Sequence, residues 1–156
     1  MKIRCIVVDD EPMARKGMQE YIGQFDYIEL VGVFENVGQV YPVLNELNVD
    51  LVFLDIEMPG LSGIDFARSL ENAPLVIIIT AYPDYALEGF ELDVVDYLVK
   101  PVSLARFSKS INKAKDILFA KRAGSKDIEK PGDSFFVKES GRFIRIFYEE
   151  ILFVEA

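Results

Sequence analysis

The stretch Leu51-Val52-Phe53-Leu54-Asp55-Ile56-Glu57-Met58-Pro59-Gly60 decides the fold of this chain. Its first four residues form a wholly apolar run, which predicts a short strand buried on both faces. Asp55 follows at the carboxyl end of that strand, which is where open α/β sheets bind ligands. An isolated Asp before a Pro-Gly segment would most often only begin a turn, so the role of Asp55 depends on its surroundings.

Four further apolar runs alternate with helix-like segments and are the other candidate strands: residues 3–8, 28–34, 75–79 and 94–99. This alternation predicts an α/β fold, in which helices cover both faces of a five-stranded parallel sheet. Because parallel strands end at a common edge, the residues that follow each run are expected to lie near one another.

Four segments carry a helical pattern between these strands: residues 12–25, 37–47, 62–70 and 103 to about 123. In the first, Pro12 suits the opening turn, and one stripe contains Met13, Gly17, Met18, Tyr21, Ile22 and Phe25. The second is the weakest helix prediction, because Pro42 removes a backbone donor near its middle.

The chain changes character after residue 123, which is the predicted end of the first domain, 1–123. Residues 124–133 are polar and rich in turn formers, so they are predicted to be a linker. Beyond it, residues 135–138 and 143–148 form a predicted hairpin, and residues 151–154 begin a third strand. Because a terminal apolar strand would leave a sheet edge uncovered, we interpret residues 134–156 as part of a truncated second domain.

The composition excludes several classes of function. The chain has no histidine, which removes histidine metal sites and Ser-His or Cys-His catalysis. Its net charge of -9 disfavours nonspecific attraction to nucleic acid. The single Cys5 lies inside an apolar run and is expected in the core. No apolar stretch approaches the roughly 20 residues of a membrane span, so we expect a cytoplasmic protein that does not associate with membranes.

Acidic residues gather at the predicted sheet edge. Asp9, Asp10 and Glu11 directly follow the first strand, and their carboxylates are expected beside Asp55. Carboxylates held a few ångström apart repel one another, and such an arrangement is stable near neutral pH mainly when a cation is bound. Oxygen ligands without histidine favour Mg²⁺.

Two further strands end in polar groups, Thr80 and Lys100. A carboxylate nucleophile that attacks a phosphoryl group needs a cation for the developing oxygen charge, a further positive donor and a hydroxyl that orients the product. Asp55 would be the nucleophile, with Mg²⁺, Lys100 and Thr80 in the other roles.

This pattern resembles the receiver domains of two-component response regulators. The resemblance covers residues 1 to about 123 and rests on four motifs: Val7-Val8-Asp9-Asp10-Glu11-Pro12, Leu54-Asp55-Ile56-Glu57-Met58-Pro59-Gly60-Leu61-Ser62-Gly63, Thr80-Ala81 and Asp96-Tyr97-Leu98-Val99-Lys100-Pro101. It implies a flavodoxin-like, doubly wound sheet with strand order 2-1-3-4-5. It also implies a cis peptide between Lys100 and Pro101.

The resemblance implies a role for each site residue. Asp55 would accept a phosphoryl group from a phosphohistidine on a sensor histidine kinase, and Asp10, Asp55 and the backbone carbonyl of Glu57 would ligate Mg²⁺. Asp9 would act on the metal largely through water. Thr80 would then move toward the phosphoryl oxygens and Tyr97 into the vacated space, so that added charge becomes a repacked surface. Such a protein is a phosphoacceptor in a signalling relay, with self-catalysed phosphotransfer and dephosphorylation only.

The segment 82–97 and the tail 135–156 resemble receivers joined to LytTR-type DNA-binding domains. This implies a transcription regulator of the LytR/AlgR family, in which DNA contacts lie in the complete output domain and not in this chain. The resemblance also suggests a homodimer, through residues 81–90, 94–99 and the last helix. The exposed hairpin offers a second way for two copies to associate.

Two alternatives remain open at this point. A Mg²⁺-dependent phosphohydrolase with an aspartyl-phosphate intermediate would also use an acid, a Thr and a Lys, although such enzymes typically carry Asp-x-Asp on the first strand and need a substrate cap. A purely structural α/β binding domain, for example one that holds flavin, is the third hypothesis.

Overall fold

The computed structural model describes residues 2–58, 63–70, 74–82 and 93–124, together with the backbone of two strands at 134–139 and 142–147. The first part consists of strands β1 (Ile3–Val8), β2 (Ile28–Phe34), β3 (Leu51–Leu54), β4 (Leu75–Thr80) and β5 (Asp96–Val99) and helices α1 (Pro12–Ile22), α2 (Gly63–Ser69) and α4 (Leu104–Gly124). A short 3₁₀ turn at Val37–Gln39 follows β2.

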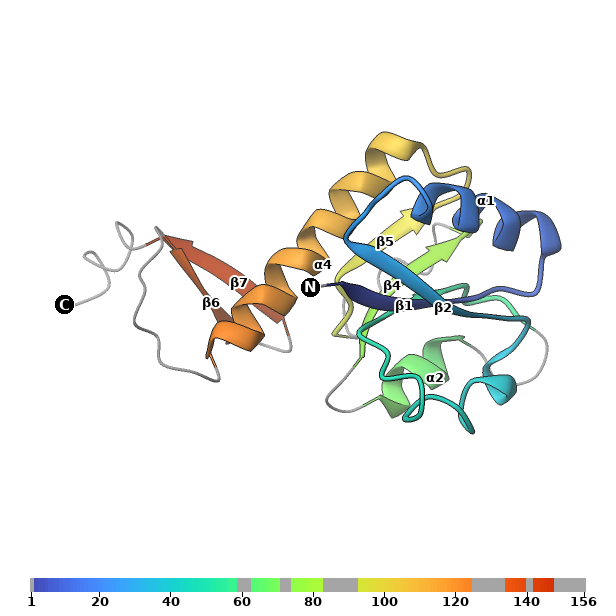
Figure 1. Ribbon diagram of the computed structural model, residues 1–156, viewed down its shortest axis with the longest axis horizontal. Helices are drawn as coiled ribbons and strands as arrows, with labels where there is room; N and C mark the ends of the chain where they lie inside the picture. Colours follow the sequence, from blue (N-terminus) through green and yellow to red (C-terminus); the bar gives the residue numbers. More distant parts are fainter. Residues whose placement is uncertain are drawn as a thin grey trace.

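The five strands form one parallel sheet in the order β2-β1-β3-β4-β5, which confirms the predicted topology (Figure 1). The register pairs Val8 with Leu54, and Leu54 with Ile78, so β1, β3 and β4 approach the same edge together. Each strand of this central part is buried along nearly its whole length. The continuous apolar runs of the sequence exist because helices and loops cover both faces.

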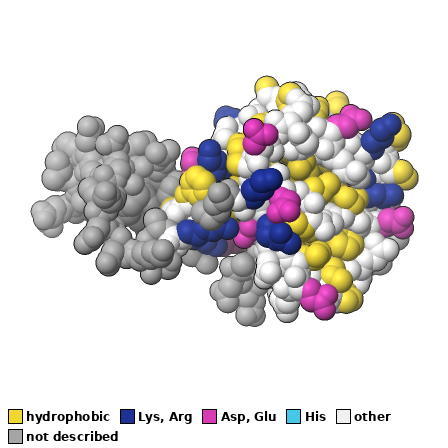
Figure 2. Space-filling model, in the orientation of Figure 1, with side chains coloured by type: hydrophobic (Ala, Val, Ile, Leu, Met, Phe, Trp, Pro, Cys, Tyr) yellow, Lys and Arg dark blue, Asp and Glu magenta, His cyan; other side chains and the backbone are white. Residues whose placement is uncertain are grey.

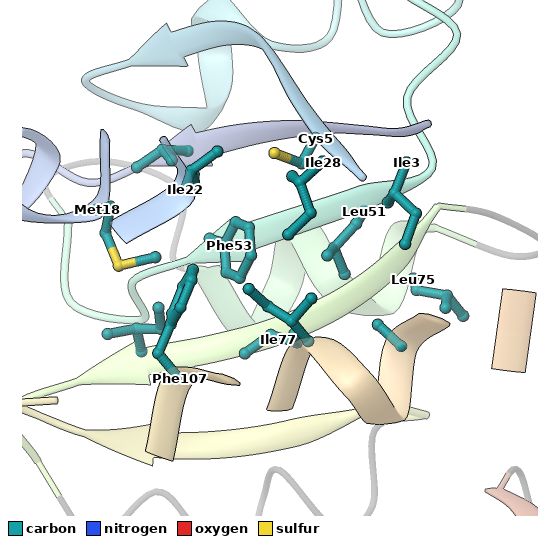
Figure 3. Close-up of a cluster of buried hydrophobic side chains, with 14 of the residues drawn as sticks. Ile3, Cys5, Met18, Ile22, Ile28, Leu51, Phe53, Leu75, Ile77 and Phe107 are labelled. Atoms are coloured by element: carbon teal, nitrogen blue, oxygen red, sulfur yellow. The ribbon is translucent and has the colours of Figure 1, made fainter. Parts of the chain in front are cut away.

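Two apolar clusters, one on each side of the sheet, hold the layers together. In the first, α1 and α4 cover β1, β3 and β4, and Figure 3 shows Met18, Phe53, Ile77 and Phe107 meeting there. The second packs α2 and the segment after β2 against the opposite face. Figure 1 shows α1 and α4 on one side of the sheet and α2 on the other, which confirms the doubly wound arrangement. Cys5 is fully buried in the first cluster, as expected, and burial raises the pKa of its thiol to about 12.

The helix predicted at 37–47 is wrong. The structure has the 3₁₀ turn Val37–Gln39 followed by turns up to Asn48, whose φ of 49° is left-handed. Pro42 has no amide hydrogen and its ring blocks a continuous α-helix, so the local hydrogen bonds mix i+3 spacing, such as Val43 to Val40, with i+4 spacing.

The other boundaries differ by a few residues. Helix α1 ends at Ile22 instead of residue 25, because the hydrogen bonds change spacing after Gly23: the amides of Gln24 and Phe25 bond to carbonyls only three residues back. Met13 is 75% exposed, although it was placed on the apolar stripe of this helix. It lies in the first turn, beyond the end of β1, where no sheet remains to cover it. Strand β4 includes Thr80, and β5 begins at Asp96 rather than residue 94.

Strands β6 (Ser134–Glu139) and β7 (Arg142–Phe147) pair antiparallel and confirm the predicted hairpin. The predicted third strand, most of the linker and the start of the predicted helix 62–70 lie outside the described residues. No helix within the described ranges combines the length and apolar content needed to cross a bilayer. On the face in Figure 2, basic side chains lie among acidic ones rather than in one broad patch.

Candidate functional site

Asp55 lies at the carboxyl edge of the sheet, directly after β3, and its side chain is only 4% exposed. Its backbone amide donates to the carbonyl of Val8 at 3.0 Å, which ties it to the end of β1. Its Oδ1 accepts a hydrogen bond from the amide of Glu57 at 3.1 Å. The carboxylate is therefore held in one orientation by the loop that follows it.

The loop after β1 brings three more carboxylates to this edge. Asp9 is buried, its amide donates to the carbonyl of Phe34, and its Oδ1 accepts from the amide of Glu11 at 2.9 Å. Asp10 and Glu11 are exposed. One oxygen from each of Asp9, Asp10, Glu11 and Asp55 can be chosen so that all four lie within 4.8 Å of one another. The predicted acidic cluster is thus present.

Lys100 joins the carboxylates of this cluster from the end of β5. Its Nζ lies 2.9 Å from Asp9 Oδ2 and 3.3 Å from Asp55 Oδ2. It also lies 3.3 Å from Glu11 Oε1. The peptide between Lys100 and Pro101 is cis, as the resemblance implied. Burial opposes the charged form of Lys100, but the hydrogen bond to Asp9 and the charges of Asp55 and Asp9 outweigh it and raise its pKa.

The electrostatic balance at Asp55 favours the protonated acid relative to an exposed carboxyl. Burial and the nearby charge of Asp9 raise the pKa of Asp55, and the charge of Lys100 and the Glu57 amide only partly offset them. An ionised Asp55 is therefore costly here without further positive charge. The cluster offers oxygen ligands only, a donor set that suits Mg²⁺.

Thr80 and Tyr97 lie beside this centre and are linked through Tyr82. Thr80 is fully buried, and its Oγ1 accepts a hydrogen bond from the amide of Tyr82 at 3.3 Å. The hydroxyl of Tyr97 donates to the carbonyl of Tyr82 at 2.7 Å. Tyr97 is half-buried and packs against the second apolar cluster.

The site residues predicted from the sequence therefore fall into three groups. Lys100 is in direct contact with Asp9 and Asp55. Asp10 and Glu57 lie on the loops that carry these two carboxylates. Thr80 and Tyr97 each form a hydrogen bond with the backbone of Tyr82. The roles of Asp10 and of the Glu57 carbonyl as metal ligands, and the movement of Thr80 and Tyr97, remain predictions.

Three contacts at the site were not predicted. Arg15 donates from Nη1 to the carbonyl of Asp9 at 2.7 Å, and its Nη2 lies 3.7 Å from Glu35 Oε1. Gly63 approaches the backbone of Asp55 and Ile56 so closely that a Cβ there would overlap the Asp55 carbonyl. A glycine in the motif that follows Asp55 is a signal that could have indicated this close approach, whereas the contacts of Arg15 have no local signal in the sequence.

Comparison with known proteins finds that most of this chain matches one family of domains. Residues 5–112 match the family model described as the response regulator receiver domain. The chain is 36% identical over 111 residues to the transcriptional regulatory protein BtsR of Escherichia coli strain K12, an alignment that covers 70% of this chain and 46% of that protein. It is 34% identical over 119 residues to the sensory transduction protein LytR of Staphylococcus saprophyticus, with 74% and 47% covered.

Solved structures agree with this assignment. The response regulatory domain of protein mrkE from Klebsiella pneumoniae superposes with a TM-score of 0.66 at 32% identity, and the match covers 77% of this chain and 98% of that one. The chain spans about half the length of the curated relatives that it matches.

Proposed function

Because this chain belongs to the response regulator receiver domain family, we propose that Asp55 is its phosphoacceptor and receives a phosphoryl group from a sensor histidine kinase. The observation that carries the proposal is the buried carboxylate of Asp55 at the sheet edge, 3.3 Å from the ammonium of Lys100 and within an acidic cluster.

The transfer forms a bond between a carboxylate oxygen of Asp55 and phosphorus, and it breaks the bond between phosphorus and the donor nitrogen of a phosphohistidine. Lys100 already lies beside Asp55 Oδ2, so it can neutralise charge on the transferred group. Oδ1 is held by the amide of Glu57, which limits rotation of the carboxylate. The chain contributes positioning and charge, in keeping with phosphoryl transfer in general.

We further propose that the site binds Mg²⁺ through Asp10, Asp55 and the backbone carbonyl of Glu57, with Asp9 acting largely through water. Asp9 makes the shorter contact with Lys100, 2.9 Å against 3.3 Å for Asp55, and Asp10 is exposed within the acidic cluster, which supports this division. When bound, Mg²⁺ neutralises charge on the phosphoryl oxygens and offsets the repulsion among the carboxylates.

The conformational response would run through Thr80 and Tyr97. Both contact the backbone of Tyr82, so a shift of Thr80 toward a phosphoryl oxygen can disturb the acceptor of the Tyr97 hydroxyl. Repacking at Tyr97 would change the surface near β5.

We propose a cytoplasmic transcription regulator of the LytR/AlgR type, organised as a receiver (1–123), a linker (124–133) and part of a LytTR-type DNA-binding domain (134–156). The similarity to BtsR and LytR supports this, as does the hairpin of β6 and β7. DNA would be bound by the full-length output domain, and a homodimer would bring two such domains together.

The receiver family favours a signalling role over the phosphohydrolase hypothesis, so the proposed activity is self-catalysed phosphotransfer and dephosphorylation and no turnover of an external substrate.

Intact-mass measurement tests the phosphoacceptor. The chain, incubated with a small phosphodonor such as acetyl phosphate and Mg²⁺, should gain one phosphoryl mass, and Asp55→Asn should not. Asp26→Asn removes an exposed acid elsewhere and is the matched control. Continued phosphorylation of Asp55→Asn would refute the assignment. Asp10→Asn should raise the Mg²⁺ concentration needed for half-maximal labelling, and an unchanged requirement would exclude Asp10 as a ligand.

A further inference from the structure

Tyr21 makes a long-range contact with the segment that carries Lys100. Its hydroxyl, on the second half of α1, donates a hydrogen bond of 2.7 Å to the backbone carbonyl of Val102. Val102 lies two residues after Lys100, between the end of β5 and the start of α4. The contact joins residues 81 positions apart in the sequence, so it forms only when the tertiary structure is complete.

The ring of Tyr21 is supported by the same core that supports Asp55. It packs against Phe107 with ring centroids 5.3 Å apart. Phe107 is fully buried and stacks on Phe53 at 5.3 Å, and Phe53 precedes Asp55 by two residues in β3. The Tyr21 hydroxyl is thus a donor fixed relative to the strand that ends in Asp55.

The segment that carries Lys100 has anchors at both ends. At its start, the amide of Lys100 itself donates a hydrogen bond of 2.8 Å to the carbonyl of Thr80 and continues the pairing of β5 with β4. After it, Arg106 in the first turn of α4 forms hydrogen bonds of 2.7 and 2.8 Å with Asp96 of β5. Between these anchors, the carbonyl of Val102 accepts the hydrogen bond from the Tyr21 hydroxyl of helix α1, which lies on the same side of the sheet as α4.

A lysine side chain is long and flexible, so the place of its ammonium depends on where the backbone presents it. Groups that act on a reacting centre must be held to about 0.5 Å, which requires support from residues around them. Lys100 must keep its Nζ near both Asp9 and Asp55 to act on a phosphoryl group at Asp55.

We propose that Tyr21 is a positioning residue for Lys100: its hydroxyl fixes the backbone after Lys100 and so sets the ammonium between Asp9 and Asp55. This inference rests on the proposed phosphotransfer function. Loss of one net hydrogen bond of ordinary strength predicts a phosphorylation rate about three- to tenfold lower.

The substitution Tyr21→Phe tests this, because it removes the hydroxyl and keeps the ring on Phe107. Tyr27→Phe is the matched control, since the Tyr27 hydroxyl also reaches α4, at Asn112 Oδ1 3.1 Å away, but on the part of the helix far from Lys100. With acetyl phosphate and Mg²⁺, Tyr21→Phe should be slower by this factor, and Tyr27→Phe should match the original chain.

The same pair is then measured in a Lys100→Ala background. If Tyr21 acts through Lys100, Tyr21→Phe has no further effect there, whereas a general loss of stability would slow both backgrounds equally. Equal slowing in the two backgrounds, or equal rates for Tyr21→Phe and the original chain, overturns the proposal.

A second measurement does not depend on phosphorylation. In protein labelled with ¹⁵N-lysine, the Lys100 ammonium signal is assigned by its loss in Lys100→Ala. Tyr21→Phe should shift this signal or speed its hydrogen exchange, while Tyr27→Phe should leave it unchanged. An unshifted signal in Tyr21→Phe also overturns the positioning role. If the original chain is not phosphorylated at all, the proposed function fails, and the ammonium signal still decides whether Tyr21 positions Lys100.

Discussion

The hydroxyl of Tyr97 donates a 2.7 Å hydrogen bond to the backbone carbonyl of Tyr82, the residue whose amide contacts Thr80. Tyr82 therefore connects the buried hydroxyl of Thr80, at the end of β4, with an aromatic side chain on β5. Residue 82 contributes only its backbone amide and carbonyl to these two hydrogen bonds, so they do not depend on which side chain it carries.

Tyr97→Phe removes this hydrogen bond and keeps the ring in its packing site. We expect the free energy of unfolding to fall by about 0.5–1.5 kcal/mol, the usual net value of one hydrogen bond. The rate of Asp55 phosphorylation should stay within about twofold, because the hydrogen bond that is lost joins Tyr97 to the backbone carbonyl of Tyr82. Urea unfolding and intact-mass kinetics provide the two measurements. Tyr41→Phe, which loses a contact with Ser69, is the control. A phosphorylation rate more than about tenfold lower would place the Tyr97 hydroxyl in the transfer step itself.

Lys100→Ala should destabilise the protein at neutral pH. Asp9 and Asp55 would then face each other, buried, without the cation that lies between them. We expect a loss of about 1–3 kcal/mol in the free energy of unfolding, since the Lys100 side chain is 19% exposed and solvent screens part of the effect. Mg²⁺ should restore part of the loss. Thermal unfolding with and without Mg²⁺ measures both, with Lys16→Ala as an exposed control. Equal unfolding temperatures for Lys100→Ala and Lys16→Ala would contradict the prediction.

The raised pKa of Asp55 predicts a pH-dependent effect of Asp55→Asn. The folded state binds the proton more tightly than the unfolded state, so ionised Asp55 lowers stability at neutral pH, and protonation relieves this as the pH falls through the raised pKa. Asp55→Asn should therefore be more stable than the original chain at pH 7 without Mg²⁺. The difference should shrink below the ordinary pKa of 3.8.

Urea unfolding between about pH 2.5 and pH 8 measures this difference, because that range extends about one unit below and several units above the ordinary Asp pKa. Asp26→Asn serves as the control for the loss of one exposed charge. A stability difference that stays constant over this range would show that the ionisation of Asp55 is not its cause.

Gly63→Ala should disturb the site, because a Cβ there would overlap the Asp55 carbonyl and lie 2.9 Å from Cα of Ile56. Backbone atoms cannot give way as a flexible side chain can, so we expect a loss of about 2 kcal/mol or more, together with slower phosphorylation. Gly17→Ala is the matched control in a helix. No atom lies within 4 Å of a Cβ at position 17, and the substitution should stabilise by about 0.5–1 kcal/mol. Thermal unfolding of both variants measures the contrast, and equal effects would contradict it.

The fold was largely predictable because its main signals are local. A parallel sheet covered on both faces requires continuous apolar strands, and β1, β3 and β4 show them plainly. The strand order came from the family resemblance and is confirmed. The prediction failed at 37–47, where apolar spacing favoured a helix but the backbone of Pro42 could not continue one.

The site was predictable to the extent that its residues stand at strand ends. Asp9, Asp55, Thr80 and Lys100 are each within one residue of a strand terminus, so the parallel topology brings them to one edge. No such rule applies to Tyr21, Arg15 or Tyr82. Their partners depend on how a helix or loop packs against a distant segment.

Local pattern was therefore sufficient for the strands, for the acidic cluster and for the placement of Asp55 at the edge of the sheet, because apolar runs and the polar residues that end them can be read from consecutive residues. Three-dimensional packing was needed to establish that Lys100 touches Asp9, Glu11 and Asp55 at once. It was also needed to bring Tyr21 to Val102 across 81 residues. Such contacts follow from the docking of whole helices onto the sheet, a property of the complete apolar core that no short segment encodes.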